Sequence, residues 1–267
     1  MTTRTDRILD GLFTWVGRLI VGIGALFMAV PALFIAMLSF SNDQHIAFPP
    51  KTWGVNRYVD LFTSDTWAAP IGLSLRLAAV TAVVALLLVL PAIIGLKRSN
   101  LRGGGFIEGA SVAPMLFPVA AYAVGLYAVF AEVGLLASFQ GIVISHVIHA
   151  VPMVVIILST AMDQIRPELE LAAMTMGASR GRAWLGVTLR LLTPAVAGAA
   201  IFAFVSSFDE AVFITFLGGP GLVTLPKLIF DSVQFGVDPA ITAVATVLMI
   251  VTSALLFFAT RLRKDVR

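Results

Sequence analysis

The chain has 267 residues, of which 59% are hydrophobic and 12% are charged, and its mean hydropathy is +0.97. So few charges cannot coat a water-soluble globule, so the composition predicts an integral membrane protein. The formal net charge of +3 is small and scattered along the chain, which argues against nucleic acid as a partner. The chain has no cysteine, which excludes disulfides, thiolate metal sites and cysteine nucleophiles.

Six apolar runs are long enough to cross a membrane core of about 30 Å, which takes roughly 20 helical residues. We expect helices, because lipid cannot satisfy exposed backbone groups and the runs lack the alternation of a membrane strand. The charged segment before the first run is not followed by a cleavage site, so no removable signal peptide is predicted. The predicted spans are about 18 to 40, 70 to 96, 106 to 130, 136 to 161, 194 to 217 and 240 to 260.

The distribution of Lys and Arg predicts the orientation, because basic residues in short loops remain in the cytoplasm. Three basic residues fall on one side of the predicted spans, namely Lys51, Arg57 and Lys227. Fourteen fall on the other side: Arg4, Arg7, Arg18, Lys97, Arg98, Arg102, Arg166, Arg180, Arg182, Arg190, Arg261, Arg263, Lys264 and Arg267. Both termini and the segment 163 to 193 are therefore predicted to be cytoplasmic.

The segment 163 to 193, called the elbow below, is amphipathic and bears several Arg residues between two apolar runs. Asp163 can cap a first short helix, and Pro167 suits its first turn. Gly177 has the permissive backbone needed for a sharp stop, and Ser179 can cap a second helix. The sequence therefore predicts a helix, a turn and a second helix in the cytoplasm, a surface that an energising partner could use.

The string LAAMTMGAS at 171 to 179 resembles the signature of E-A-A, three residues, G in permease subunits of binding-protein-dependent ABC importers of the type I (MetI-like) fold. Two departures are that Leu171 stands at the glutamate position, with Glu170 one residue earlier, and that Leu189-Arg190 replaces a Leu-Pro ending. The resemblance implies that the elbow contacts an ATPase subunit. The residues it assigns to that coupling are Glu170, Leu171, Ala172, Ala173, Met176, Gly177, Ala178, Ser179 and Arg180.

The resemblance extends over nearly the whole chain, most closely from 163 to 260. Beyond the elbow it is carried by SFDE at 207 to 210, GP at 219 to 220, TLP at 224 to 226 and GVDP at 236 to 239. These runs are similar to those of the second permease of spermidine/putrescine importers. The resemblance implies an all-α fold of six transmembrane helices, in a single permease domain over residues 1 to 267.

The resemblance also implies an assembly in the bacterial inner membrane. Its parts are a homologous second permease, two ATP-binding cassette subunits that bind ATP and Mg, and an external, periplasmic or extracellular, substrate-binding protein. This chain would meet membrane lipid and a small-molecule substrate. Its own sequence lacks the G-x-x-x-x-G-K-[ST] phosphate loop. We therefore expect no cofactor in this chain and no enzymatic activity of its own.

Two adjacent acids, Asp209 and Glu210, fall inside a predicted span, where a charge costs about 2.5 to 3.5 kcal/mol on insertion scales and usually faces protein or water. One hypothesis places a carboxylate, with Asp209 the first choice, against a cationic substrate. The other pairs an acid with Arg76, at matching depth in the second span. On one helix adjacent side chains diverge by about 100°, so at most one acid would face a pore. The candidate substrate-pathway residues are Tyr122, Ser206, Phe208, Asp209 and Glu210.

His146 and His149 lie three residues apart on one helical face, a spacing that can hold a metal ion. No acid or cysteine nearby in the sequence completes a site, so packing is favoured and no metal is expected.

The favoured function is import of a small organic cation, with a polyamine (spermidine or putrescine) as first choice. The same machinery could instead carry gamma-aminobutyrate, an opine, aminoethylphosphonate or thiamine. The alternatives of another class are a secondary transporter or channel that works without ATP, and an intramembrane hydrolase.

Overall fold

The structure is a computed structural model of the chain and describes residues 4–99, 101–236 and 238–264. In these ranges every regular element is a helix, and the only β contact is an antiparallel bridge between Ser41 and Trp53. Val237, in one of the family-like runs, and Arg267, one of the orienting charges, lie outside the described residues. The chain forms two compact units, one from Met1–Ala68 with Ser232–Arg267 and one from Ala69–Asp231.

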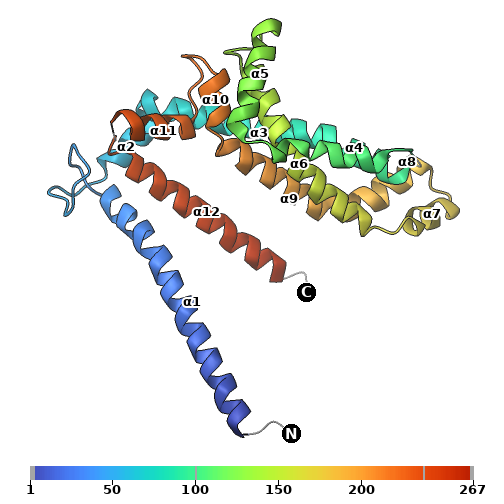
Figure 1. The fold of residues 1–267 in the computed structure, drawn as a ribbon, viewed down its shortest axis with the longest axis horizontal. Coiled ribbons are helices and arrows are strands. Elements are labelled where there is room, and N and C mark those ends of the chain that lie inside the picture. Colours follow the sequence, from blue (N-terminus) through green and yellow to red (C-terminus); the bar gives the residue numbers. More distant parts are fainter. Residues whose placement is uncertain (1–3, 100, 237, 265–267) are drawn as a thin grey trace. The chain divides into compact units, whose positions relative to one another are not determined.

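In the first unit, α1 and α12 meet near α2, as Figure 1 shows. Most apolar side chains of α1 are exposed, as suits a helix whose surroundings are lipid or another apolar helix. Between the first two predicted spans, which end at about 40 and begin at about 70, the chain also forms a short helix, α2. The bounds are α1 Arg4–Ser39, α2 Asn56–Thr63 and α12 Ile241–Lys264.

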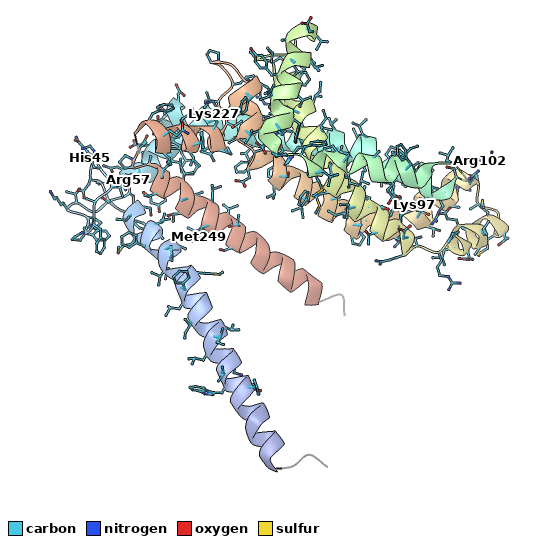
Figure 2. The ribbon with its side chains drawn as sticks, viewed as in Figure 1. His45, Arg57, Lys97, Arg102, Lys227 and Met249 are labelled. Carbon is cyan, nitrogen blue, oxygen red and sulfur yellow. The ribbon has the colours of Figure 1, made fainter. Side chains whose placement is uncertain are left out.

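A buried arginine joins the elements of the first unit. The Arg57 guanidinium, labelled in Figure 2, donates to the carbonyl of Leu38 at 2.8 Å and to the hydroxyl of Thr242 at 3.1 Å. It also donates to the carbonyl of Asp43 at 2.9 Å. A guanidinium has five donors and no acceptor, so a buried one needs several acceptors around it. Arg57 therefore links α2 to the end of α1 and the start of α12.

The second unit is built on the packing of α6 against α9. Fully buried alanines, Ala150 on α6 and Ala199 and Ala203 on α9, let the two backbones approach closely. The core continues to Phe213 and Leu217 of α10, which contacts α5. The bounds are α3 Asp65–Arg98, α4 Gly104–Ser111, η1 Ala113–Leu116, α5 Val119–Val133, α6 Phe139–Asp163, α7 Glu168–Thr175, α8 Arg180–Ala183, η2 Trp184–Thr188, α9 Leu189–Phe208, α10 Val212–Leu217 and α11 Leu225–Phe235.

Four helical stretches of the described chain are long and apolar enough to cross a membrane: Phe13–Ser39, Asp65–Arg98, Phe139–Asp163 and Arg180–Phe208. They correspond to the first, second, fourth and fifth predicted spans. Two shorter apolar helical stretches, Val119–Val133 and Ile241–Ala254, fall in the third and sixth.

The expectation of one continuous helix over 106 to 130 is wrong. The chain there forms α4, the 3₁₀ helix η1 and α5, with Phe117 extended at φ −104° and ψ 141°. Two prolines explain the break. Pro114 cannot donate a backbone hydrogen bond, and Pro118 disfavours the helical conformation of the residue before it.

The expected helix over 194 to 217 is also wrong in its limits. The span begins earlier, because α8, the π-helical segment η2 and α9 follow one another from Arg180 to Phe208. It ends earlier as well, because the chain leaves the helix at Asp209 and a separate short helix, α10, begins at Val212. The two acids therefore lie in a helix break and not on a continuous helix.

Candidate functional site

The break between α9 and α10 positions the Glu210 carboxylate. Its Oε1 accepts the backbone N–H of Val212 at 2.5 Å, which satisfies one of the N–H groups left free at the start of α10. The Glu210 side chain is only 10% exposed, whereas Asp209 is exposed. The two adjacent acids thus have different environments, and Glu210 is the one that faces the interior of the second unit.

The group opposite Glu210 is a histidine from α6. His149 Nε2 lies 3.9 Å from Glu210 Oε2, and His149 Nδ1 lies 2.8 Å from the hydroxyl of Tyr122 on α5. When the Tyr122 hydroxyl donates to Nδ1, the proton of a neutral imidazole resides on Nε2, which is the nitrogen nearest the carboxylate. Three separate segments, α5, α6 and the α9–α10 break, therefore meet through polar side chains.

An aromatic side chain packs against both Tyr122 and His149. Phe213 of α10 is fully buried, and its ring centroid lies 5.1 Å from that of Tyr122 and 5.8 Å from that of His149. Tyr122, His149, Glu210 and Phe213 are called the Glu210 cluster below. Rings around a carboxylate are an environment in which an organic cation can gain both ion-pair and cation–π contacts.

His146, one helical turn before His149, is 1% exposed and makes a polar contact from α6 to α9. Its Nδ1 lies 2.8 Å from the hydroxyl of Ser207. Its Nε2 has no hydrogen-bond partner among the described residues. No group of three or more His, Cys, Asp or Glu side chains gathers into a possible metal site in that part of the chain.

A small pocket of about 140 Å³ borders the Glu210 cluster. It is lined by Pro114, Met115, Phe117, Val119 and His149. Four of these five residues come from the proline break in the third predicted span. Both helix breaks therefore lie beside His149, one through this pocket and the other through Glu210.

The other predicted pathway residues do not join this cluster. Phe208 stacks on Phe204 at 6.1 Å, and Ser206 is half-buried on α9. Arg76 is exposed and forms no ion pair among the described residues, so the alternative hypothesis, an acid paired with Arg76, finds no support in this arrangement. Sequence reasoning missed His149 as a partner of Glu210, because residues 61 positions apart meet only through the packing of α6 on α9 and α10. The acid that lies near His149 comes from a distant segment and does not complete a metal site among the described residues.

The elbow has the predicted helix, turn and helix. Gly177 ends the first helix with φ at +93°, a value that favours glycine, and Ser179 Oγ accepts the N–H of Arg182 at 3.4 Å to cap the second. The expectation that Asp163 caps α7 is wrong, because Asp163 is the last residue of α6 and Pro167 precedes α7. Asp163 instead pairs with Lys97 of α3 at 3.0 Å.

The Glu170 carboxylate faces inward from the elbow. It accepts from Arg98 Nε at 2.8 Å and from the hydroxyl of Thr188, and the Arg98 and Glu170 side chains are each 16% exposed. Leu171 and Met176 point outward, 55% and 89% exposed. The outer surface of α7 is therefore apolar at the position where the importer signature has glutamate, and the neighbouring glutamate holds the elbow to α3.

A second set of charges ties the ends of α3, α4 and α6 together. Lys97, labelled in Figure 2, lies 3.0 Å from carboxylate oxygens of both Glu108 and Asp163. Glu108 also accepts from the hydroxyl of Ser159 on α6. Between α3 and the elbow lies a pocket of about 440 Å³, whose charged lining residues are Arg98, Glu170 and Arg180.

A family model described as "Binding-protein-dependent transport system inner membrane component" matches residues 78–264. The chain belongs to this family. The permease is 29% identical over 208 residues to the putrescine transport system permease protein PotI of Escherichia coli K12, covering 74% of this chain and 73% of the relative. It is 29% identical over 218 residues to the spermidine/putrescine transport system permease protein PotC of Haemophilus influenzae, covering 81% and 84%.

A solved structure shows the same fold. One chain of a bacterial ABC transporter involved in the import of the acidic polysaccharide alginate matches the permease with a TM-score of 0.78 at 17% identity, covering 98% of both chains. A second alginate ABC transporter structure, in complex with a pentasaccharide-bound periplasmic protein, matches with a TM-score of 0.72. The fold is thus the all-helical, MetI-like fold of ABC permeases.

These comparisons confirm the predicted resemblance. The chain is a multi-pass inner-membrane permease subunit of a type I ABC importer, and it resembles the second permease of spermidine/putrescine systems. Its relatives are permease subunits and not enzymes.

Proposed function

We propose that this permease imports a small organic cation, with a polyamine as its cargo. The observation that carries the proposal is the Glu210 cluster, in which a carboxylate that is 10% exposed lies beside a histidine and an aromatic ring at a helix break. A carboxylate kept among apolar helices is costly, and contact with a cation offsets that cost. Relatives named for putrescine and spermidine support the same cargo.

The fold alone leaves the cargo open, since the matching solved structure belongs to an importer of an acidic polysaccharide. The cargo assignment therefore depends on side chains along the pathway. We assign substrate contact to Glu210 and Tyr122, with Ser206, Phe208 and Asp209 lining the same route. Arg76, exposed on α3, takes no part in this route.

The elbow, in this proposal, seats on an ATPase subunit and carries its motion to the spans. Closure of the ATPase pair would move α7 and α8, and the contact from Arg98 to Glu170 would pass that movement to α3. Such coupling requires contacts that differ between two states of the transporter. The elbow residues proposed to meet the ATPase are Leu171, Ala172, Ala173, Met176, Gly177, Ala178, Ser179 and Arg180, with Glu170 holding them in place.

The complete machine would contain a homologous second permease, two ATPase subunits that bind ATP and Mg, and an external substrate-binding protein. Within it the present chain would form one permease domain over residues 1 to 267, with six spans and both termini in the cytoplasm. It would hold no nucleotide site of its own, because its sequence has no phosphate loop.

The test is uptake of labelled spermidine and putrescine by cells that carry the complete transporter, with unlabelled gamma-aminobutyrate as competitor. Wild-type permease is compared with Gly177→Asp, after the amount of each in the membrane has been matched. We expect polyamine uptake that the elbow variant abolishes. Accumulation of gamma-aminobutyrate in place of polyamine would show that the cargo is not a polyamine. Uptake that continues without ATP would show that the protein works as a secondary transporter and not as an ABC importer.

A further inference from the structure

The two oxygens of the Glu210 carboxylate are in different situations. Oε1 is committed to the backbone, because it accepts the N–H of Val212 at 2.5 Å. Oε2 lies 3.9 Å from His149 Nε2, which is longer than the usual 2.7 to 3.2 Å of an N–H to oxygen hydrogen bond. The attraction between His149 and Glu210 is therefore electrostatic at this distance, and Oε2 keeps its capacity to accept a closer donor.

His149 is held in place on one side and borders open volume on another. Its Nδ1 bonds the Tyr122 hydroxyl at 2.8 Å, and the Phe213 ring meets it edge-on with centroids 5.8 Å apart. Its side chain is 29% exposed and lines the pocket of about 140 Å³ formed with the proline break. A ligand in that pocket would contact the His149 imidazole, whose Nε2 lies 3.9 Å from Glu210 Oε2.

We infer that His149 is a specificity-determining residue, whose protonated imidazole takes the cation's place beside Glu210 until the ammonium group of the substrate displaces it. The inference rests on the proposed function, since it requires a cationic cargo that reaches Glu210. An imidazolium and an ammonium group are both cations that can neutralise one carboxylate, so they compete for it. A neutral imidazole leaves the site open to the cargo.

Competition of this kind links cargo affinity to pH. Histidine is the side chain that changes charge between about pH 5 and pH 8. In acid a protonated imidazole therefore occupies the position beside the Glu210 carboxylate, and in alkaline conditions the imidazole is neutral and leaves the carboxylate to the cargo. The apparent KM for a cationic cargo should then rise as pH falls, while the maximal rate is little changed. This direction is opposite to that expected if protonated His149 helped to bind an anion.

Few other titratable groups face His149. Tyr122 comes from α5, and its phenol stays neutral between about pH 5 and pH 8. His146, from the same helix, has no acidic partner among the described residues and bonds Ser207 instead. Glu210 and the exposed Asp209 come from the α9–α10 break, and α10 contributes the uncharged Phe213.

The experiment uses the complete transporter in proteoliposomes with saturating binding protein, and measures labelled putrescine uptake from about pH 5.5 to about pH 8. The key variant is His149→Gln, whose amide can donate towards Glu210 but carries no charge. The matched control is His45→Gln, because His45 is an exposed histidine outside the cluster. Glu210→Gln completes the set.

The wild type is expected to show a rise of about tenfold in apparent KM from the alkaline to the acidic end of this range, because a protonated histidine competes with the cargo for the carboxylate. His149→Gln should show a change below about twofold, and His45→Gln should follow the wild type. Glu210→Gln should bind putrescine weakly at every pH.

Uptake of putrescine by the wild type with a flat pH profile would overturn the role of His149 and leave the cargo assignment intact. The same holds if His149→Gln keeps the wild-type slope. If His149→Gln does not assemble, the wild-type profile and its loss in Glu210→Gln still test the inference. Absence of putrescine uptake at every pH would instead contradict the proposed function, and the inference with it.

Discussion

Arg98 Nε donates to Glu170 at 2.8 Å and thereby joins the end of α3 to the elbow helix α7. The Thr188 hydroxyl donates to the same carboxylate oxygen, so one side chain of α7 holds two other segments. The residue one position later, Leu171, is exposed. In this permease, the glutamate next to the signature position braces the elbow internally, and the position itself presents an apolar side chain outward.

Removal of this brace should loosen the elbow. We expect Glu170→Ala to destabilise the solubilised transporter by about 1–3 kcal/mol, because the mostly buried Arg98 guanidinium would lose its carboxylate acceptor and keep only the Ile165 carbonyl. ATP-driven uptake should fall with it. The matched control is Glu168→Ala on the same helix, whose partner Arg166 lies at 3.6 Å with both side chains more than half exposed. Exposed pairs contribute about 0–1 kcal/mol, so equal thermal shifts for the two variants would contradict the bracing role.

The turn at Gly177 should tolerate no side chain without strain. A residue other than glycine pays about 1–2 kcal/mol in the left-handed region, and Gly177 has φ at +93°. We expect Gly177→Ala to lower the amount of cargo moved per ATP hydrolysed in the complete transporter. Gly181→Ala is the control, since Gly181 lies in the ordinary helix α8. Unchanged coupling in Gly177→Ala would show that the turn is not the mechanical part we propose.

The two acids of the α9–α10 break should differ in their effect on transport. Glu210→Gln removes the charge that faces His149, so we expect its apparent KM for putrescine to rise by about tenfold or more, equivalent to about 1.4 kcal/mol. Asp209→Asn changes an exposed side chain and should alter the KM by less than about twofold. Kinetics of labelled putrescine uptake decide the matter. A larger effect at Asp209 would reverse our assignment.

The stability of the turn around Asp43, before α2, should depend on pH. The Thr52 hydroxyl and the backbone N–H groups of Lys51 and Thr52 donate to Asp43, and these hydrogen bonds hold the pKa of Asp43 below its usual value of 3.8. A lowered pKa in the folded chain means that the ionised carboxylate stabilises the fold. This contribution is present above the usual pKa and is lost as pH falls through the lower, folded value.

Hydrogen exchange at the Lys51 and Thr52 amides reports on this turn. We expect these amides to be better protected in the wild type than in Asp43→Asn near neutral pH, with the difference shrinking in acid below about pH 4. Asp60→Asn, on α2, serves as the control. A difference that persists unchanged in acid would show that the carboxylate charge is not what orders the turn.

Local sequence patterns predict the membrane class, the elbow and the family of this permease. Its apolar runs predict a helical membrane protein, and the elbow follows from a glycine stop and a serine cap within a few residues of each other. The family follows from the string at 171 to 179 and the runs beyond it. Each of these features depends on neighbours along the chain, which is why residue order suffices to find them.

The helix breaks and the partners across them depend on packing. The sequence shows prolines at 114 and 118, but membrane helices tolerate prolines when neighbouring groups satisfy the freed backbone groups. Whether these prolines break the helix therefore depends on the helices that pack around them. The break at Asp209 turns Glu210 inward, towards His149 of α6, and leaves Arg76 of α3 without either acid. Which charges meet is set by how α5, α6, α9 and α10 pack, because contacts between distant residues depend on the positions of whole helices.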